Sequence, residues 1–155
     1  MRGAFTLYEY DKSRLLKVQI NGSNVKNSSD NANVRYEYYD DGKLKTVIYP
    51  TLADGTVLKS EYEYDGLSRL TSLINYKDTL VLSSYFYTYD NNGNILTTTE
   101  TVGQTQNSTS YSYDNLNRIT KVSGTKSADS YYEYDERGNR KVKNSLVTGQ
   151  FLLHL

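Results

Sequence analysis

A short motif built on two tyrosines and an aspartate recurs six times along the 155-residue chain. It can be written Tyr-x-Tyr-Asp-x-x-Gly/Asn/Ser-Arg-Leu, with lapses, and its first tyrosines lie 28, 26, 25, 24 and 21 residues apart. Self-similarity at such a period is the sequence signature of a repeat architecture, in which each copy forms one supersecondary unit. The six copies begin at Tyr8, Tyr36, Tyr62, Tyr87, Tyr111 and Tyr132.

Each copy predicts a β-hairpin. The alternating Tyr-x-Tyr has the period of a strand, and the aspartate that follows can accept backbone N–H groups at the start of a turn. In four repeats a residue suited to positive φ follows three positions later, as a type I turn with a bulge requires; these are Gly42 (three after Tyr39), Gly93, Asn117 and Gly138. A second apolar strand comes next, and a variable polar segment returns the chain to the following hairpin.

The third repeat fixes a strand register. A three-residue loop would place Asp65 opposite Arg69 and Tyr64 opposite Leu70. Because residues opposite each other share a face, Tyr62, Tyr64 and Leu70 would then lie on one side of the sheet. Glu63, Asp65 and Arg69 would lie on the other.

The first repeat is one residue shorter and supports the same register. A two-residue loop, Lys12-Ser13, keeps Asp11 opposite Arg14 and Tyr10 opposite Leu15. The deletion therefore falls where both pairs are preserved.

The second repeat is ambiguous. Asp41-Gly42 is a strong signal for a two-residue hairpin loop. That loop would pair Leu44 with Tyr39 rather than with Tyr38, so two registers stay open.

A single two-stranded hairpin is marginal in water, so the repeats are expected to stack side by side into one sheet of about twelve strands. The predicted class is all-β: an antiparallel β-hairpin array in a curved or spiralling sheet, one array over residues 1–155 with a terminal tail at 144–155. The residues to which the repeat assigns a structural role are Tyr8, Tyr10, Asp11, Arg14, Leu15, Tyr36, Tyr38, Gly42, Leu44, Tyr62, Tyr64, Asp65, Arg69, Leu70, Tyr87, Tyr89, Asp90, Gly93, Ile95, Tyr111, Tyr113, Asp114, Arg118, Ile119, Tyr132, Tyr134, Asp135 and Gly138.

Composition narrows the possible functions. Eighteen basic residues balance eighteen acidic ones, which argues against a nucleic-acid partner, since no broad positive field results. No cysteine is present for a disulfide or a thiolate metal site, and no cofactor is predicted. No apolar run approaches about 18 residues, so no membrane span is expected. Residues 1–7 turn polar too soon to act as a signal peptide.

Other chemistries are weaker interpretations of the same residues. Tyrosines can stack on sugars, but their recurrence at every hairpin favours packing. Five turn aspartates could be calcium ligands, yet they stand one per hairpin, whereas calcium needs several oxygens to converge. The candidates for other roles are Arg14, Arg69 and Arg118 (anion binding), Glu9, Glu37, Glu63 and Glu133 (a glycosidase carboxylate pair), His154 (a hydrolytic triad), and Asn21, Asn27 and Asn107 (N-glycosylation). For the arginines and glutamates we favour cross-strand ion pairs and a solvated face.

The six Tyr-x-Tyr-Asp-x-x-Gly-x-Leu units resemble the YD repeats of the Rhs family, over residues 8 to about 143. That family includes bacterial Rhs polymorphic toxins, wall-associated proteins, large subunits of insecticidal toxin complexes, and teneurins. The resemblance implies a β-sheet that spirals into a hollow shell, which in the toxins encloses a C-terminal effector. The Asp-Pro-x-Gly signature that ends bacterial shells is missing here, where the only proline is Pro50.

From this resemblance we expect a fragment of a larger protein: a non-catalytic, partial YD shell rather than an enzyme. Its expected partners are the rest of the polypeptide and an enclosed effector, and the parent is expected to be secreted or displayed at the cell surface. The alternative is a repeat module that binds carbohydrate or a cell-surface partner.

Overall fold

The computed structural model describes residues 6–20, 33–125, 127–147 and 150–154, which form thirteen strands and no helix. None of these segments could cross a bilayer as a helix. The strands are β1 Thr6–Asp11, β2 Arg14–Ile20, β3 Asn33–Tyr38, β4 Leu44–Ile48, β5 Leu58–Tyr64, β6 Leu70–Lys77, β7 Leu80–Tyr89, β8 Ile95–Val102, β9 Thr105–Tyr113, β10 Ile119–Gly124, β11 Ser127–Tyr134, β12 Arg140–Val147 and β13 Gln150–His154.

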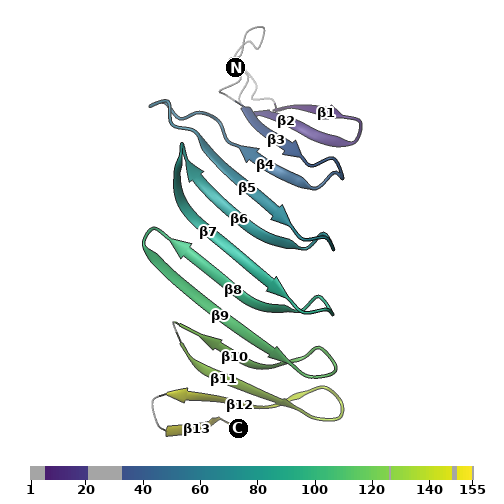
Figure 1. Cartoon of the computed structure of the whole chain (residues 1–155), viewed down its shortest axis with the longest axis vertical. Helices are drawn as coiled ribbons and strands as arrows, with labels where there is room; N and C mark the ends of the chain where they lie inside the picture. The colour runs from purple at the N-terminus through teal and green to yellow at the C-terminus, as the bar shows by residue number, and fades with distance from the viewer. Residues whose placement is uncertain (1–5, 21–32, 126, 148–149, 155) are drawn as a thin grey trace, which may run out of the picture. The chain divides into compact units, whose positions relative to one another are not determined.

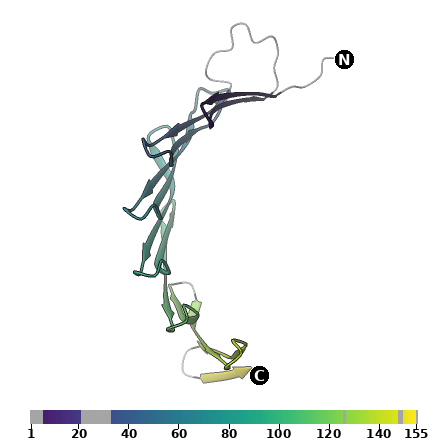
Figure 2. The same ribbon diagram turned by 90° about the vertical axis from the view of Figure 1, so that its right-hand side faces the viewer.

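The chain divides into two compact units, Met1–Ser84 and Tyr85–Leu155. In each unit, strands that are neighbours in the sequence are neighbours in the sheet and run antiparallel, as Figure 1 shows. Seen from the side, each unit is a single layer of strands (Figure 2). The all-β antiparallel hairpin class is therefore confirmed. That both units belong to one uninterrupted array stays a prediction.

Residues 144–147 and 150–154 of the predicted terminal tail lie in strands. β12 runs on to Val147, and β13 pairs with it, from Val147 opposite Gln150 to Lys143 opposite His154. The physical reason is the outer edge of β12, whose N–H and C=O groups need partners that an apolar segment such as 150–154 can supply. The last strand is therefore a pairing outside the repeat motif.

The register predicted for the first and third repeats is confirmed. Tyr10 lies opposite Leu15. Tyr64 lies opposite Leu70, and the Asp65 N–H donates to the Arg69 carbonyl oxygen at 2.9 Å.

The second repeat takes the longer of its two possible loops. Tyr38 pairs with Leu44, and the Tyr39 N–H donates to the Lys43 carbonyl oxygen at 2.9 Å. Tyr39 thus stands where the other repeats have the turn aspartate.

Positive φ angles occur where the turn chemistry requires them. Gly42, Gly93 and Gly138 have φ of 89°, 89° and 84°, and Asn117 has 59°. The prediction for these four positions is confirmed. Ser68 takes the same place in the third repeat with φ of 65°, at a modest conformational cost for a residue with a Cβ.

A β-bulge interrupts each of the five hairpins whose register is described, and the sequence did not predict it. The register shifts one step in from the turn, so one residue of the second strand has no partner opposite. The unpaired residues are Leu16, Lys45, Thr71, Thr120 and Lys141. Because of the bulge, residues three apart share a face: Leu70 and Leu73 lie opposite Tyr64 and Tyr62 respectively.

Very few side chains are fully covered in these single layers. Val47 is the only buried hydrophobic residue in the part of the chain that the structure describes. The other buried residues are short and polar: Thr46, Thr56, Ser60, Ser72 and Ser84. Without a second layer, a side chain is covered only when it is short enough to lie between larger neighbours. The larger neighbours that cover these short residues are tyrosines and leucines.

Candidate functional site: the turn edge and the junctions between repeats

Within each unit, the residues of the repeat meet at the turns. We call these turns the turn edge of that unit and define it as residues 11–14, 39–43 and 65–69 in the first unit, and 90–94, 114–118 and 135–139 in the second. At the third turn, the Asp65 carboxylate accepts the N–H groups of Leu67 and Arg69 at 2.9 and 3.0 Å, and the Arg69 Nε at 2.7 Å. Asp114 holds Leu116 and Arg118 in the same way. The aspartate therefore caps the turn and orients the arginine that leaves it.

In the fourth and sixth repeats an asparagine replaces that arginine. Asp90 accepts the Asn94 N–H at 2.8 Å and its side-chain amide at 2.9 Å. Asp135 accepts the same two groups of Asn139 at 2.7 and 3.0 Å. In both kinds of repeat, the aspartate carboxylate thus accepts hydrogen bonds from the backbone and the side chain of its own turn.

These hydrogen bonds favour the ionised carboxylate. The backbone N–H of Arg69 is the main cause that lowers the pKa of Asp65, and the Arg118 guanidinium is the main cause for Asp114. The side-chain amides of Asn94 and Asn139 lower the pKa of Asp90 and Asp135. All four aspartates are half-buried and still reached by solvent, which partly screens these interactions.

Tyrosine hydroxyls join one hairpin to the next. In the second unit, the Tyr113 hydroxyl donates to the Ile95 carbonyl oxygen at 2.8 Å, and the Tyr134 hydroxyl donates to that of Ile119 at 2.8 Å. In the first unit, Tyr38 donates to Leu15 at 2.7 Å. Each bond links the second tyrosine of one repeat to the leucine or isoleucine of the repeat before it. We call these bonds tyrosine latches.

The tyrosine latches lie just beyond the end of the backbone pairing between neighbouring hairpins. The pairs that join β8 to β9 begin at Thr97 and Ser110, two residues beyond Ile95. The pairs that join β10 to β11 end at Lys121 and Tyr131, two residues short of Ile119. A buried carbonyl oxygen needs a donor, and the tyrosine hydroxyl supplies one beyond the end of the backbone pairing.

Removing one latch hydroxyl has a measurable expected effect. Tyr113→Phe keeps the ring and loses the bond to Ile95, which is expected to lower the free energy of unfolding by about 1 kcal/mol. For a chain of this length, the thermal midpoint should fall by about 2–4 °C. Circular dichroism melting curves of the two proteins measure the difference.

The matched control is Tyr8→Phe, which removes the hydroxyl of a tyrosine that is 59% exposed. That midpoint should stay at the wild-type value. Equal midpoints for Tyr113→Phe and the wild type would show that the latch contributes nothing.

Two kinds of junction connect neighbouring turns. In the arginine junction, the guanidinium of one repeat lies over the latch tyrosine of the next: Arg14 is 5.7 Å from the Tyr38 ring centre and Arg118 is 4.5 Å from that of Tyr134. Both distances lie within the range of a cation–π contact. This junction combines with the latch on the same tyrosine.

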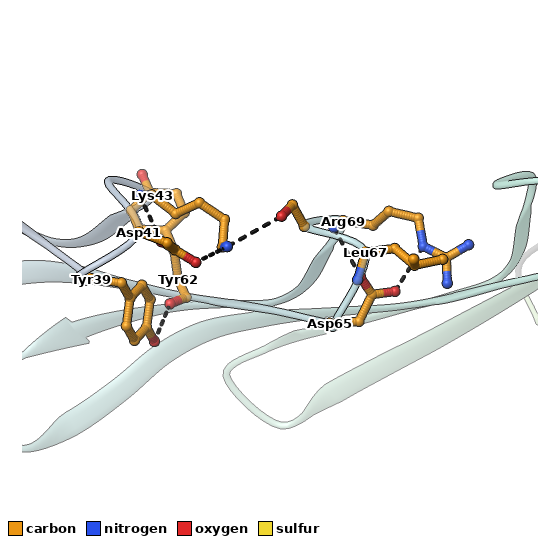
Figure 3. A network of polar contacts seen from close by, with 8 residues as sticks. Tyr39, Asp41, Lys43, Tyr62, Asp65, Leu67 and Arg69 are labelled. Atoms are coloured by element: carbon orange, nitrogen blue, oxygen red, sulfur yellow. Dashed lines mark hydrogen bonds and ion pairs between the residues drawn. The ribbon is translucent and has the colours of Figure 1, made fainter.

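In the turn-to-turn junction, the residue that ends one turn reaches the positive-φ residue of the next. The Lys43 Nζ donates to the Ser68 hydroxyl at 3.2 Å while it also pairs with Asp41. Figure 3 shows Lys43 extending from its own turn toward the third turn. The Asn94 amide donates to Asn117 Oδ1 at 2.8 Å in the same way. The odd-numbered repeats carry the arginine, and the even-numbered ones carry Lys43, Asn94 or Asn139.

The structure shows where the residues considered for other chemistries lie. No three His, Cys, Asp or Glu side chains converge on a point within the described ranges. Arg14, Arg69 and Arg118 pair with the aspartates of their own turns, at 3.4, 2.7 and 2.6 Å. Glu9, Glu37, Glu63 and Glu133 alternate with the tyrosines along their strands and so lie on the opposite face.

Some of the remaining candidate residues lie outside the part of the chain that the structure describes. Asn21 and Asn27 lie outside the described residues, as does the side chain of His154, whose backbone pairs with Lys143 in β13. Asn107 lies in β9 opposite Glu100 and is half-buried.

Sequence reasoning missed two features of this edge: the positive φ of Ser68 and the turn-to-turn junction. The first had a visible signal, since Ser68 stands at the motif position where four other repeats have glycine or asparagine.

Comparisons with known proteins agree with this architecture. A family described as teneurin YD-shell matches residues 4–152. Among solved structures, the crystal structure of TcdB2-TccC3-Cdc42 matches with a TM-score of 0.71 at 17% identity, over 97% of this chain. The Photorhabdus luminescens Tc holotoxin pore with the TccC3-D651A mutation matches with a TM-score of 0.63 at 17% identity, over 96% of this chain.

The chain spans only 9% of the length of each of these two solved chains, and at such identity the likeness concerns the fold. No curated protein matches the sequence. The predicted resemblance to YD-repeat proteins is confirmed. With hairpins joined at their turns within each unit and a family match over nearly its whole length, the chain belongs to the teneurin YD-shell family.

Proposed function

We propose that this chain is a non-catalytic wall segment of a larger, secreted or surface-displayed YD-shell polypeptide, and that the wall encloses a cargo such as a toxin or effector. The observation that carries the proposal is the use of the repeat residues. The turn aspartates cap turns, and the tyrosine hydroxyls and arginines join neighbouring hairpins. The repeat positions described above are thus used for holding the sheet together.

The matched relatives support the same proposal by context. The solved chains that resemble this one are about ten times longer and belong to multi-component assemblies, among them TcdB2-TccC3-Cdc42 and a Tc holotoxin pore. A segment of one-tenth of such a chain would contribute part of a wall rather than a complete compartment. Its two faces differ near the turn, since Tyr62 and Tyr64 with their partners Leu73 and Leu70 lie on one, and Lys59, Glu61 and Glu63 lie on the other.

Photo-crosslinking in the full-length polypeptide tests enclosure. A photoreactive phenylalanine analogue placed at Tyr62 reports on the tyrosine face, and the same analogue at Glu61, the neighbouring residue, reports on the opposite face. A wall around a cargo predicts crosslinks to another segment of the same polypeptide from only one of the two positions. Crosslinks from neither position would contradict enclosure.

A second candidate function is a local binding site, as in the alternative of a carbohydrate or cell-surface binding module. One observation favours it: the repeat pattern breaks at Tyr39, where an aromatic side chain replaces the turn aspartate. A role in holding the sheet together would recur with the repeat, whereas a binding site would be local.

A further inference from the structure

The sixth repeat breaks the motif at its last position, where an arginine replaces an aliphatic residue. Arg140 lies opposite Tyr134 in the sheet, just as Leu70 lies opposite Tyr64 in the third repeat. It therefore belongs to the face that carries the tyrosines. The residues at this position in the five earlier repeats are Leu15, Leu44, Leu70, Ile95 and Ile119.

A hollow of about 200 Å³ lies beside Arg140 in the second unit. Its other walls are Ile119 and Val122 of β10 and Tyr132 and Tyr134 of β11. The latch from the Tyr134 hydroxyl to the Ile119 carbonyl oxygen, at 2.8 Å, holds two of these walls together. Sites for drug-sized ligands have about 300–1,000 Å³, so this one has room for a single ring with a short arm. We call it the Arg140 hollow.

Arg140 differs from the arginines of the odd repeats in that its own turn does not neutralise it. It stands one position later in the motif, and the Asp135 carboxylate accepts the backbone and side-chain N–H groups of Asn139 instead. Among the residues that the structure describes, no carboxylate forms an ion pair with Arg140. The sequence contains no Asp or Glu after Glu136. A positive charge without a negative partner therefore lies at the hollow.

The tyrosine rings hold the guanidinium near the hollow. The Arg140 guanidinium lies 5.4 Å from the ring centre of Tyr132, within the range of a cation–π contact. Arg118 lies 4.5 Å from the ring centre of Tyr134, but its charge is already paired with Asp114 at 2.6 Å. An incoming anion would thus be attracted mainly by Arg140.

The walls select the kind of anion. A guanidinium presents N–H donors in a planar fork that matches a carboxylate in two parallel hydrogen bonds. Among the described residues, no second cation lines the hollow, so the additional charge of a phosphate would lack a partner there. The aliphatic and aromatic side chains favour an apolar body, and tyrosine rings pack well against another ring. A neutral ligand would gain nothing from the arginine.

We infer that the Arg140 hollow binds an aromatic monocarboxylate. The carboxylate accepts two N–H groups of Arg140, and the ring packs against the tyrosines and the aliphatic walls of β10. This binding site is separate from the proposed wall function and does not depend on whether the shell encloses a cargo.

Two sources supply an aromatic monocarboxylate: a free acid, and the C-terminus of a peptide that ends in an aromatic residue. 3-Phenylpropionate represents the first, and an N-acetylated tripeptide that ends in phenylalanine represents the second. Binding of either probe supports the inference, and the tighter of the two identifies the source.

Arg140→Leu separates binding from folding. It restores the residue that other repeats have at this position, so the hairpin should fold with an unchanged or higher thermal midpoint. Arg140→Lys is the second variant, which keeps the charge but loses the planar fork. The matched control is Arg137→Leu, the same substitution in the same repeat but outside the hollow. Position 137 also tolerates leucine in other repeats, as Leu67 and Leu116 show.

The experiment is an NMR titration of the whole chain with the two carboxylate probes at neutral pH. 3-Phenylpropionamide serves as the neutral isostere and phenyl phosphate as the probe with the additional charge. We expect at least one carboxylate to saturate with a Kd on the order of 1 mM. Binding should be at least tenfold weaker for the amide and for Arg140→Leu, weaker also for Arg140→Lys, and unchanged for Arg137→Leu.

Four outcomes would overturn the inference: neither carboxylate saturates, the amide binds as tightly as the acid, phenyl phosphate binds more tightly than both carboxylates, or Arg140→Leu binds as the wild type does. None of these bears on the proposed wall function, since the photo-crosslinking at Tyr62 and Glu61 measures a different property. A failure of one proposal can therefore be told from a failure of the other.

Discussion

Replacing Ser60 with leucine is expected to lower the free energy of unfolding by about 3 kcal/mol, because it both overpacks a covered position and leaves a neighbour without its hydrogen bond. Ser60 is 4% exposed and lies between Val47 of β4 and Asn75 of β6. Its hydroxyl donates to Asn75 Oδ1 at 2.6 Å, and the Asn75 amide donates to the Ser83 hydroxyl at 2.9 Å.

Thermal unfolding of the whole chain measures this effect, and a loss of about 3 kcal/mol corresponds to a midpoint lower by roughly 6–12 °C. Ser60→Ala separates the two causes: it loses the hydrogen bond without overpacking and should cost about 1 kcal/mol. Ser112→Leu, at an exposed serine in β9, is the control for adding a leucine to the sheet. A midpoint for Ser60→Leu no lower than that of Ser112→Leu would show that Ser60 is not tightly surrounded.

Acid is expected to destabilise the protein more than any single substitution, because the fold lowers the pKa of many carboxylates and each of them loses its contribution to stability when it is protonated. The groups whose pKa is lowered in the fold are Asp41, Asp54, Glu61, Asp65, Asp90, Asp114, Asp129 and Asp135. A pKa that is lower in the folded state gives a contribution that is fully present above the unfolded value, about 3.9 for aspartate. That contribution is lost as the pH falls through the lowered value.

Thermal midpoints measured from about pH 7 down to about pH 2 at constant ionic strength should therefore fall steeply below about pH 4. The control is a variant with asparagine at positions 65, 90, 114 and 135. Asparagine Oδ1 still accepts the backbone N–H groups of the turn but carries no titrating proton. This variant should start from a lower midpoint and lose less of it in acid, and an unchanged pH dependence would show that the turn carboxylates are not responsible.

Local features of the fold followed from the sequence because short-range chemistry determines them. The aspartate turns, the positive φ at Gly93 and Asn117, and the pairing of Tyr64 with Leu70 each depend on a few adjacent residues. A motif repeated six times also allows each copy to test the others. The shorter first repeat confirmed the register for this reason.

Features that depend on contacts between hairpins did not follow. The bulge residues Leu16, Lys45 and Thr71 share no side-chain chemistry, so nothing at these positions identifies a bulge. The tyrosine latches depend on where the ladder between hairpins stops, which no single repeat reveals. Ser60 is buried only because of its neighbours on adjacent strands.

At the turn edge of the first unit, the signal for the contact between Tyr39 and Tyr64 was present but ambiguous. Tyr39 could have been a strand residue opposite Leu44, which the two-residue loop at Asp41-Gly42 would have required. The structure instead places Tyr39 at the turn, opposite Lys43, and so beside Tyr64. A difference of one residue in loop length therefore decides whether the two tyrosine rings meet.

The alternation of the two junctions limits how such a sequence can change its length during evolution. Arg14, Arg69 and Arg118 belong to odd repeats, and Lys43, Asn94 and Asn139 to even ones. Duplication or loss of a single hairpin would set two repeats of the same kind beside each other, so a guanidinium would approach a turn built to receive an amine or amide. Duplication or loss of two adjacent hairpins leaves every junction of its original type, so we expect such arrays to gain or lose hairpins in pairs, about fifty residues at a time.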